Sequence, residues 1–217
     1  SKAMVCYLTG LRSVAWKSKL STPGLIFLGA DGNFGVVGSF SALDTAMYTT
    51  CLEKEDFYFF DASGRYGVAL NYYDALCYTL RHLGFTKGRI GCELSGGFHL
   101  HMDIAMFNDL RREFPELEFV DSSELFWDIL AVKSEAQLRN LRDAEEINRL
   151  AAARGLEAVR PGAMTELELY REIAKAGYLA GSEHFTYMSV LAGAGRALCA
   201  DCPASDAVVI PDAPGTT

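Results

Sequence analysis

The stretch KSEAQLRNLRDAEEINRLAAARGLEAVRPGAMTELELYREI, residues 133–173, predicts two amphipathic helices joined by a tight turn. Ser134 and Gln137 have the spacing of a capping box, in which each side chain binds the backbone N–H of the other residue, so the first helix begins here. Pro161 and Gly162 end it. The apolar residues at helical spacing predict a buried stripe, which consists of Leu138, Leu141, Ala144, Ile147 and Ala151.

The second helix of this stretch begins with another capping box. Thr165 and Glu168 have the required spacing, so we expect a helix from Glu166 to about Ala180, closed by Gly181. Glu166 and Glu168 look like paired carboxylates. In the first turn of a helix, however, such residues are capping and helix-dipole partners, and we interpret them in this way.

Upstream of residue 121 the pattern alternates between strands and helices. The turn Asp31-Gly32-Asn33 predicts a hairpin over residues 25–38. The apolar segment at residues 1–10 also has a strand-like composition. The further expected elements are strands at 56–61, 89–94 and 117–121 and helices at 71–84 and 98–114. This alternation predicts an α/β domain with a mostly parallel sheet and helices on its faces.

The pattern changes after Asp121, which predicts a domain boundary near residues 121–132. We therefore expect one domain over residues 1–122 and a second over residues 132–217. In the second domain, FTYMSVLAG (185–193) and AVVI (207–210) are expected strands. Because elements begin and stop abruptly at both ends, we also expect the chain to be part of a longer protein.

Composition narrows the classes of partner and compartment. The net charge is −8, from 20 basic and 28 acidic residues, and this argues against nucleic acid or an anionic membrane as a partner. No apolar run reaches the roughly 20 residues of a membrane span, and no secretory signal segment is visible. Most of the 6 cysteines lie singly in apolar stretches, which is typical of reduced thiols. We expect a cytoplasmic protein.

The residues of the opening stretch, taken together, resemble a known family. The order of a Lys-Ser pair, an L-R-x-A helix core and P-G-x-T-E-x-E-L is similar to the start of the catalytic domain in the creatinase, prolidase and aminopeptidase P family. The matching residues are Lys133, Ser134, Leu141, Arg142, Ala144, Pro161, Gly162, Thr165, Glu166, Glu168 and Leu169. CYLTG (6–10) and RIGCEL (89–94) resemble motifs of that family's N-terminal domain. Each motif alone is weak, and the ordered set is strong.

The resemblance implies an N-terminal α/β domain followed by an incomplete α+β pita-bread domain, usually in a homodimer. Most members of the family hydrolyse a C–N bond, typically the peptide bond before proline, with two divalent metal ions such as manganese, cobalt or zinc. All five family ligands lie downstream of this segment, so no metal ligand is assigned here. Creatinase, in the same family, works without metal and uses a histidine as its acid/base.

The chain departs from the family pattern at the stretch ALCADCPASD, residues 197–206. The family has a histidine in this region, and the candidate positions here hold Ala200 or Asp201. Cys199 and Cys202 form a C-x-x-C pair that allows three interpretations: structural thiols, substrate-pocket residues, or a redox or metal pair. A redox pair requires a helix N-terminus and zinc requires two further ligands, so a structural role is favoured. Asp201 and Cys202 are the candidate substrate-binding residues.

His184 is the candidate catalytic residue, because the resemblance places it just before a strand beside the active-site cleft. The alternative is an ordinary loop histidine. His99 and His101 are expected on one helix, where a spacing of two directs them apart, and His82 is interpreted as a helix-end residue.

The sequence therefore predicts an Xaa-Pro peptidase-like metallohydrolase that acts on a small peptide or a small C–N substrate. We expect the present segment to be inactive alone. Two alternatives stay open: a metal-independent, creatinase-like hydrolase, and a non-catalytic relative that serves binding or dimerisation.

Overall fold

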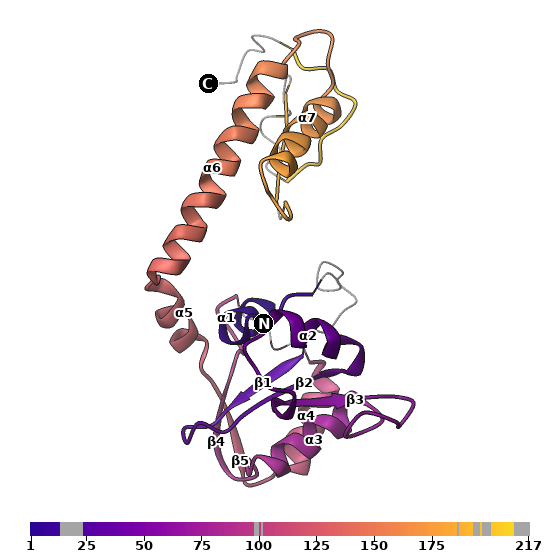
Figure 1. The fold of residues 1–217 in the computed structure, drawn as a ribbon, viewed down its shortest axis with the longest axis vertical. Helices are drawn as coiled ribbons and strands as arrows, with labels where there is room; N and C mark the ends of the chain where they lie inside the picture. Colours follow the sequence, from indigo (N-terminus) through magenta and orange to yellow (C-terminus); the bar gives the residue numbers. More distant parts are fainter. Residues whose placement is uncertain are drawn as a thin grey trace. The chain divides into compact units, whose positions relative to one another are not determined.

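The computed structural model describes residues 1–13, 24–97, 100, 102–185, 187–192, 196 and 201–210. The chain divides into two compact units, Ser1–Ala131 and Val132–Thr217 (Figure 1). The elements of the first unit are α1 (Lys2–Thr9), β1 (Leu25–Leu28), β2 (Phe34–Ser39), the 3₁₀ helix η2 (Phe40–Ala42), α2 (Leu43–Thr49), η3 (Lys54–Asp56), β3 (Phe57–Phe60), α3 (Tyr72–His82), β4 (Gly88–Cys92), α4 (Ile104–Glu113), β5 (Leu117–Asp121) and α5 (Ser123–Ala131).

The strands of the first unit form two small sheets. β1 and β2 are the antiparallel hairpin that the sequence predicts, and β2 pairs with β3 in parallel. β4 and β5 form a separate parallel pair. The predicted parallel strand direction is therefore confirmed for two pairs, β2 with β3 and β4 with β5. The prediction of a single sheet is wrong, since no strand pairing among the described residues joins β1 to β4.

Helices cover both faces of this layer (Figure 1). Alternate residues of a strand point to opposite faces. Val37 and Tyr58 pack in one buried cluster with residues of α3 and α4, whereas their neighbours Val36 and Phe57 pack in a second cluster with residues of α1 and α2. The first unit is thus a three-layer α/β arrangement.

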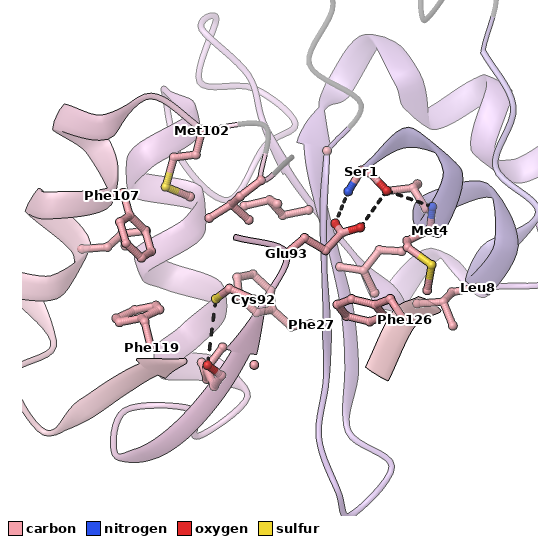
Figure 2. A pocket seen from close by; sticks show the side chains of 18 of the residues that line it. Ser1, Met4, Leu8, Phe27, Cys92, Glu93, Met102, Phe107, Phe119 and Phe126 are labelled. Atoms are coloured by element: carbon pink, nitrogen blue, oxygen red, sulfur yellow. Dashed lines mark hydrogen bonds and ion pairs between the residues drawn. The ribbon is translucent and has the colours of Figure 1, made fainter. Parts of the chain in front are cut away.

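Residues 2–9 form a helix, not the strand that the composition of residues 1–10 suggests. The hydroxyl of Ser1 accepts a hydrogen bond from the N–H of Met4 and caps α1 (Figure 2). Gly10 ends the helix with φ 76°, a conformation that glycine adopts at little cost. Met4, Val5 and Thr9 are buried together on one face, a helical rather than an alternating spacing.

The helix expected at residues 98–114 is shorter than predicted. The carboxylate of Asp103 accepts a hydrogen bond from Met106 N–H at 2.7 Å, so α4 begins at Ile104. His99 and His101 precede this cap and lie outside the described residues. The helix expected at 71–84 is confirmed as α3, capped by Asn71. Gly84 follows it with φ 76°.

Asp121 explains why α5, which no pattern predicted, belongs to the first unit. Its carboxylate accepts hydrogen bonds from the N–H and hydroxyl of Ser123 at 3.0 and 2.6 Å, from the hydroxyl of Ser95, and from the N–H of Leu94 at 3.3 Å. These bonds hold the pKa of Asp121 at about 2. They join the end of β5 to the start of α5 and to the loop after β4.

The second unit contains a helical hairpin of α6 (Glu135–Ala158) and α7 (Glu166–Leu179). Both predicted capping boxes are present, Ser134 with Gln137 and Thr165 with Glu168. The helices approach closely at Gly155, where an added methyl group would lie 2.5 Å from Cγ1 of Ile173. An alanine at this crossing would force the side chain of Ile173 to shift.

Two expectations for the second unit are wrong. Of the predicted stripe on α6, Leu141 and Ala144 are exposed and Ala151 is buried, because the unit's core lies against the C-terminal part of that helix only. The described residues of 185–193 and 207–210 form no strand. Val208 makes one isolated bridge with Thr165, while Val190 and Val209 pack in a core with Met164 and Leu169.

Candidate functional site

A buried carboxylate organises the second unit. Glu166 is the first residue of α7, and its side chain is fully buried. Its Oε1 accepts hydrogen bonds from Ala192 N–H at 2.8 Å and Arg196 Nε at 2.7 Å. Its Oε2 accepts from the N–H and the hydroxyl of Ser205, at 3.1 and 2.9 Å. Arg196 also donates to the carbonyl of Pro203 at 3.1 Å, so one carboxylate holds three separate parts of the following chain.

The charge of Glu166 is stabilised by these donors. Burial alone would raise the pKa of its carboxyl, but the hydrogen bonds from Arg196, Ala192 and Ser205 together outweigh burial and hold the pKa at about 2. A carboxylate with four donors is committed to structure and is not placed to accept a proton from a substrate. Glu166 therefore anchors the loop that carries the candidate residues.

The structure brings Asp201 and Cys202 beside residues 187–189. The hydroxyl of Tyr187 donates to Oδ1 of Asp201 at 3.2 Å, and the hydroxyl of Ser189 donates to the carbonyl of Cys202 at 3.5 Å. Partial desolvation and the Asp201 carboxylate raise the pKa of Tyr187, which keeps its phenol protonated as the donor. Asp201 is exposed and Cys202 half-buried. Asp201 thus presents an oriented carboxylate to solvent.

His184 lies on the exposed segment after α7. Its backbone carbonyl accepts a hydrogen bond from the Ser182 hydroxyl at 3.4 Å. Within the described part of the chain, no recorded side-chain contact joins His184 to Asp201 or Cys202. Cys199 and Ala200 lie outside the described residues, so the geometry of the C-x-x-C pair is not defined.

The sequence reasoning missed several members of this arrangement. The sequence marks Glu166 and Asp201, but no local motif marks their partners or the neighbouring contact, which involve Tyr187, Ser189, Arg196 and Ser205. The contacts of Glu166 reach residues 30 and 39 positions away in the chain. No local pattern encodes such contacts, so only the folded loop reveals them.

The described residues contain neither a cluster of metal-ligating side chains nor a membrane-spanning helix. Among them, no group of three or more His, Cys, Asp and Glu side chains is arranged to hold a metal ion. The described residues therefore provide no ligand set for the metal pair that the family resemblance implies. In the same part of the chain, no helix combines the length and apolar character needed to cross a bilayer.

No protein-family model matches the chain, and no curated protein matches it.

Comparison by structure finds several similar chains. An X-Pro aminopeptidase from Thermotoga maritima MSB8 superimposes with a TM-score of 0.73 at 19% identity, over 97% of this chain and 51% of that one. A prolidase from Pyrococcus furiosus superimposes with a TM-score of 0.72 at 16% identity, over 97% of this chain and 56% of that one. An Xaa-Pro dipeptidase from Bacillus anthracis superimposes with a TM-score of 0.67 at 16% identity, over 90% of this chain and 50% of that one.

The present chain therefore spans about half the length of these structures. At such low identity the similarity concerns the fold and not the chemistry. The matching structures are of the family that the ordered sequence motifs resemble. The chain has the fold of the corresponding half of the Xaa-Pro aminopeptidase and prolidase structures.

Proposed function

We propose that this chain is part of an Xaa-Pro peptidase-like hydrolase, which cleaves the peptide bond before proline. The observation that carries the proposal is the fold similarity over 97% of the chain to an X-Pro aminopeptidase and to a prolidase. The ordered motifs of residues 133–173 support it independently of the superposition.

Asp201 and Cys202 are proposed to contact the substrate. Tyr187 fixes one oxygen of the Asp201 carboxylate, and the side chain is exposed. An oriented carboxylate is a suitable partner for the α-ammonium group of a short peptide, through a charge-assisted hydrogen bond. Cys202 lies next to it with its backbone held by Ser189. A small peptide or another small C–N compound fits this chemistry.

His184 is the proposed acid/base. Its imidazole is exposed on the segment that leads to Tyr187, and histidine is the side chain that most often serves as a general acid or base. For the full-length protein we propose a homodimer and two divalent metal ions, of manganese, cobalt or zinc. Such ions lower the pKa of bound water. Their ligands are expected outside residues 1–217.

One observation favours a second candidate. The positions where the family resemblance expects a histidine hold Ala200 or Asp201. A divergent, creatinase-like hydrolase of a small C–N substrate, or a non-catalytic relative, would tolerate this change. Activity that does not depend on added metal would distinguish the creatinase-like hydrolase from the peptidase. The absence of any hydrolysis would identify the non-catalytic relative.

The substrate role of Asp201 is tested with Asp201→Asn in the full-length protein. Loss of a charge-assisted hydrogen bond costs about 1.5–3 kcal/mol, so KM for an Xaa-Pro dipeptide should rise roughly 10- to 100-fold. Asp206→Asn is the matched control, because Asp206 is an exposed carboxylate on the same loop. Equal kinetics for both variants would contradict the assignment of Asp201 and leave the peptidase proposal intact.

A further inference from the structure

Two segments of the second unit carry the candidate substrate residues and the residues that contact them. We call residues 187–192 the first arm and residues 201–205 the second arm. Two hydrogen bonds that join the arms directly have partners 14 and 13 positions apart in the sequence. Because this offset is nearly constant, the arms run in the same direction. The place of Asp201 beside Tyr187 therefore depends on the register between the two arms.

The second arm is held by the backbone at the start of α7. The carbonyl of Ser205 accepts a hydrogen bond from Leu167 N–H at 3.0 Å. The carbonyl of Ala207, just beyond the arm, accepts from Glu166 N–H at 2.9 Å. The first N–H groups of a helix have no partner within that helix, and these two bonds satisfy them. Since the bonds involve no side chain, a change of the side chain at position 166 should leave the second arm in place.

The first arm is held on the core by apolar contacts. Val190 is buried in a cluster with Met164 and Leu169, and Met188 packs against the same cluster. Apolar contacts have no preferred direction, so they keep the arm on the core but set its register only loosely. No backbone hydrogen bond within the described residues joins this arm to the second arm. The register must therefore come from polar contacts of side chains.

The buried carboxylate of Glu166 supplies a polar link between the arms. Its Oε1 accepts a hydrogen bond from Ala192 N–H, at the end of the first arm, at 2.8 Å. Its Oε2 accepts from Ser205 N–H, at the end of the second arm, at 3.1 Å. A hydrogen bond is directional and weakens steeply when the donor moves off line. A shift of the first arm by one residue would remove the Ala192 bond and leave a buried carboxylate short of a donor, which is costly.

We propose that Glu166 is a positioning residue for substrate binding, because it fixes the register of the first arm against the second and so holds Tyr187 beside Asp201. This inference rests on the proposed function, in which Asp201 pairs with the ammonium group of the substrate. Glu166 is fully buried and does not touch the substrate. A change at Glu166 therefore acts on substrate binding only through the orientation of Asp201.

The first test follows the hydrogen bond between Tyr187 and Asp201 in the 217-residue chain and needs no activity. Tyrosine is labelled with ¹³C at Cζ for NMR, and Tyr187→Phe identifies the signal of Tyr187. Asp201→Asn gives the signal of a Tyr187 hydroxyl that has lost its carboxylate acceptor. Glu166→Gln should move the signal toward this position, and the double variant should show no further shift. A Tyr187 signal that stays at its wild-type position in folded Glu166→Gln would overturn the proposal.

The second test measures kcat and KM of the full-length protein with an Xaa-Pro dipeptide. Glu166→Gln should raise KM roughly tenfold or more, toward the value of Asp201→Asn, with little change in kcat. The double variant should have the KM of Asp201→Asn alone, because Glu166 acts only through Asp201. A rise in KM that multiplies with that of Asp201→Asn would show two independent effects and would contradict the proposal.

Ser205→Ala is the matched control, because it weakens the same network without releasing the first arm. The change removes one hydroxyl donor from Glu166 but keeps the bonds from the backbone N–H groups of Ala192 and Ser205 to its carboxylate. It should lower the unfolding temperature and leave both KM and the Tyr187 signal close to wild type. If KM instead rose in proportion to the loss of stability in both variants, Glu166 would have only a structural role and the proposal would fail.

Glu166→Asp takes the place of Glu166→Gln if the latter does not fold. It keeps a negative charge beside Arg196, but its side chain is one methylene shorter and cannot reach both arms at once. KM should rise and the Tyr187 signal should shift as expected for Glu166→Gln. Absence of hydrolysis by the wild-type full-length protein would overturn the peptidase function and the substrate role that rests on it. An unchanged Tyr187 signal in folded Glu166→Asp would overturn the positioning of Asp201 by Glu166 and leave the peptidase function standing.

Discussion

Glu166 shows at the scale of one residue how a helix-capping position acquires a second task. The sequence predicts the capping box of Thr165 and Glu168 because both partners lie within one turn. The bonds of Glu166 to Arg196 and Ser205 are not predictable in this way, since they depend on the path of the loop. The same limit applies to the bond between Tyr187 and Asp201.

Glu166→Gln should destabilise the second unit. The change leaves the Arg196 guanidinium without its buried carboxylate, and breaking a buried ion pair from one side costs about 3–5 kcal/mol. Denaturant unfolding of the chain measures the loss. Glu168→Gln is the matched control on the same helix, because glutamine also completes a capping box and should change stability little. Equal effects of the two variants would show that Glu166 is not an anchor.

The difference in the free energy of unfolding between the wild type and Glu166→Gln should also depend on pH. The folded-state pKa of Glu166 is about 2, below the ordinary value of 4.5. The stabilisation that the Glu166 carboxylate gives to the folded state is therefore fully present above pH 4.5. It is lost as the pH falls toward 2 and the carboxylate becomes protonated. Asp121, also with a pKa of about 2, is present in both proteins and cancels in the difference. A difference that stays constant between pH 6 and about 2.5 would contradict this assignment.

At the scale of elements, predictions that rest on local caps and turns are the ones that hold. The hairpin, α3, and the starts of α6 and α7 are confirmed because their signals lie within a few residues. The predictions for residues 1–10 and 207–210 are wrong. Apolar composition does not distinguish a strand from a helix or from a core-packed segment when the pairing partner is unknown.

The α6–α7 contact offers a test at this scale. Gly155→Ala places a methyl group against Ile173 and should cost about 1–3 kcal/mol from overpacking, partly offset by better helix propensity. Combining it with Ile173→Ala should destabilise by at least ~0.5 kcal/mol less than the sum of the single changes. Denaturant unfolding of all the variants measures the coupling. Gly155→Ala with Leu169→Ala is the control pair and should be additive, and coupling of equal size there would refute a specific contact.

At the scale of the whole molecule, the family resemblance predicts the fold but not the division of the first unit's strands into two sheets. The order of motifs agrees with the structural similarity to Xaa-Pro peptidases. The division of the first unit into two sheets is not predictable from strand patterns, because each strand sequence is compatible with an edge or a central position. The pita-bread domain stays a proposal, since the described part of residues 132–217 consists of two helices and irregular segments.

The two units should differ in independent stability. A fragment of residues 1–131 should unfold cooperatively, because it keeps α5 and the Asp121–Ser123 contacts together with both core clusters. A fragment of residues 132–217 should aggregate or stay molten, since its core is small and leucines such as Leu141, Leu156 and Leu179 are exposed. Thermal melts and size exclusion measure both properties. A monomeric 132–217 fragment with a sharp transition would contradict this expectation.

The most direct test of the central proposal is release of proline from an Xaa-Pro dipeptide. The full-length protein and the 217-residue chain are assayed in parallel with added manganese, cobalt or zinc, and metal content is measured after dialysis. The account predicts cleavage by the full-length protein, and no cleavage and no stoichiometric metal for the 217-residue chain. Cleavage by the 217-residue chain, or none by the full-length protein with any of these ions, would contradict it.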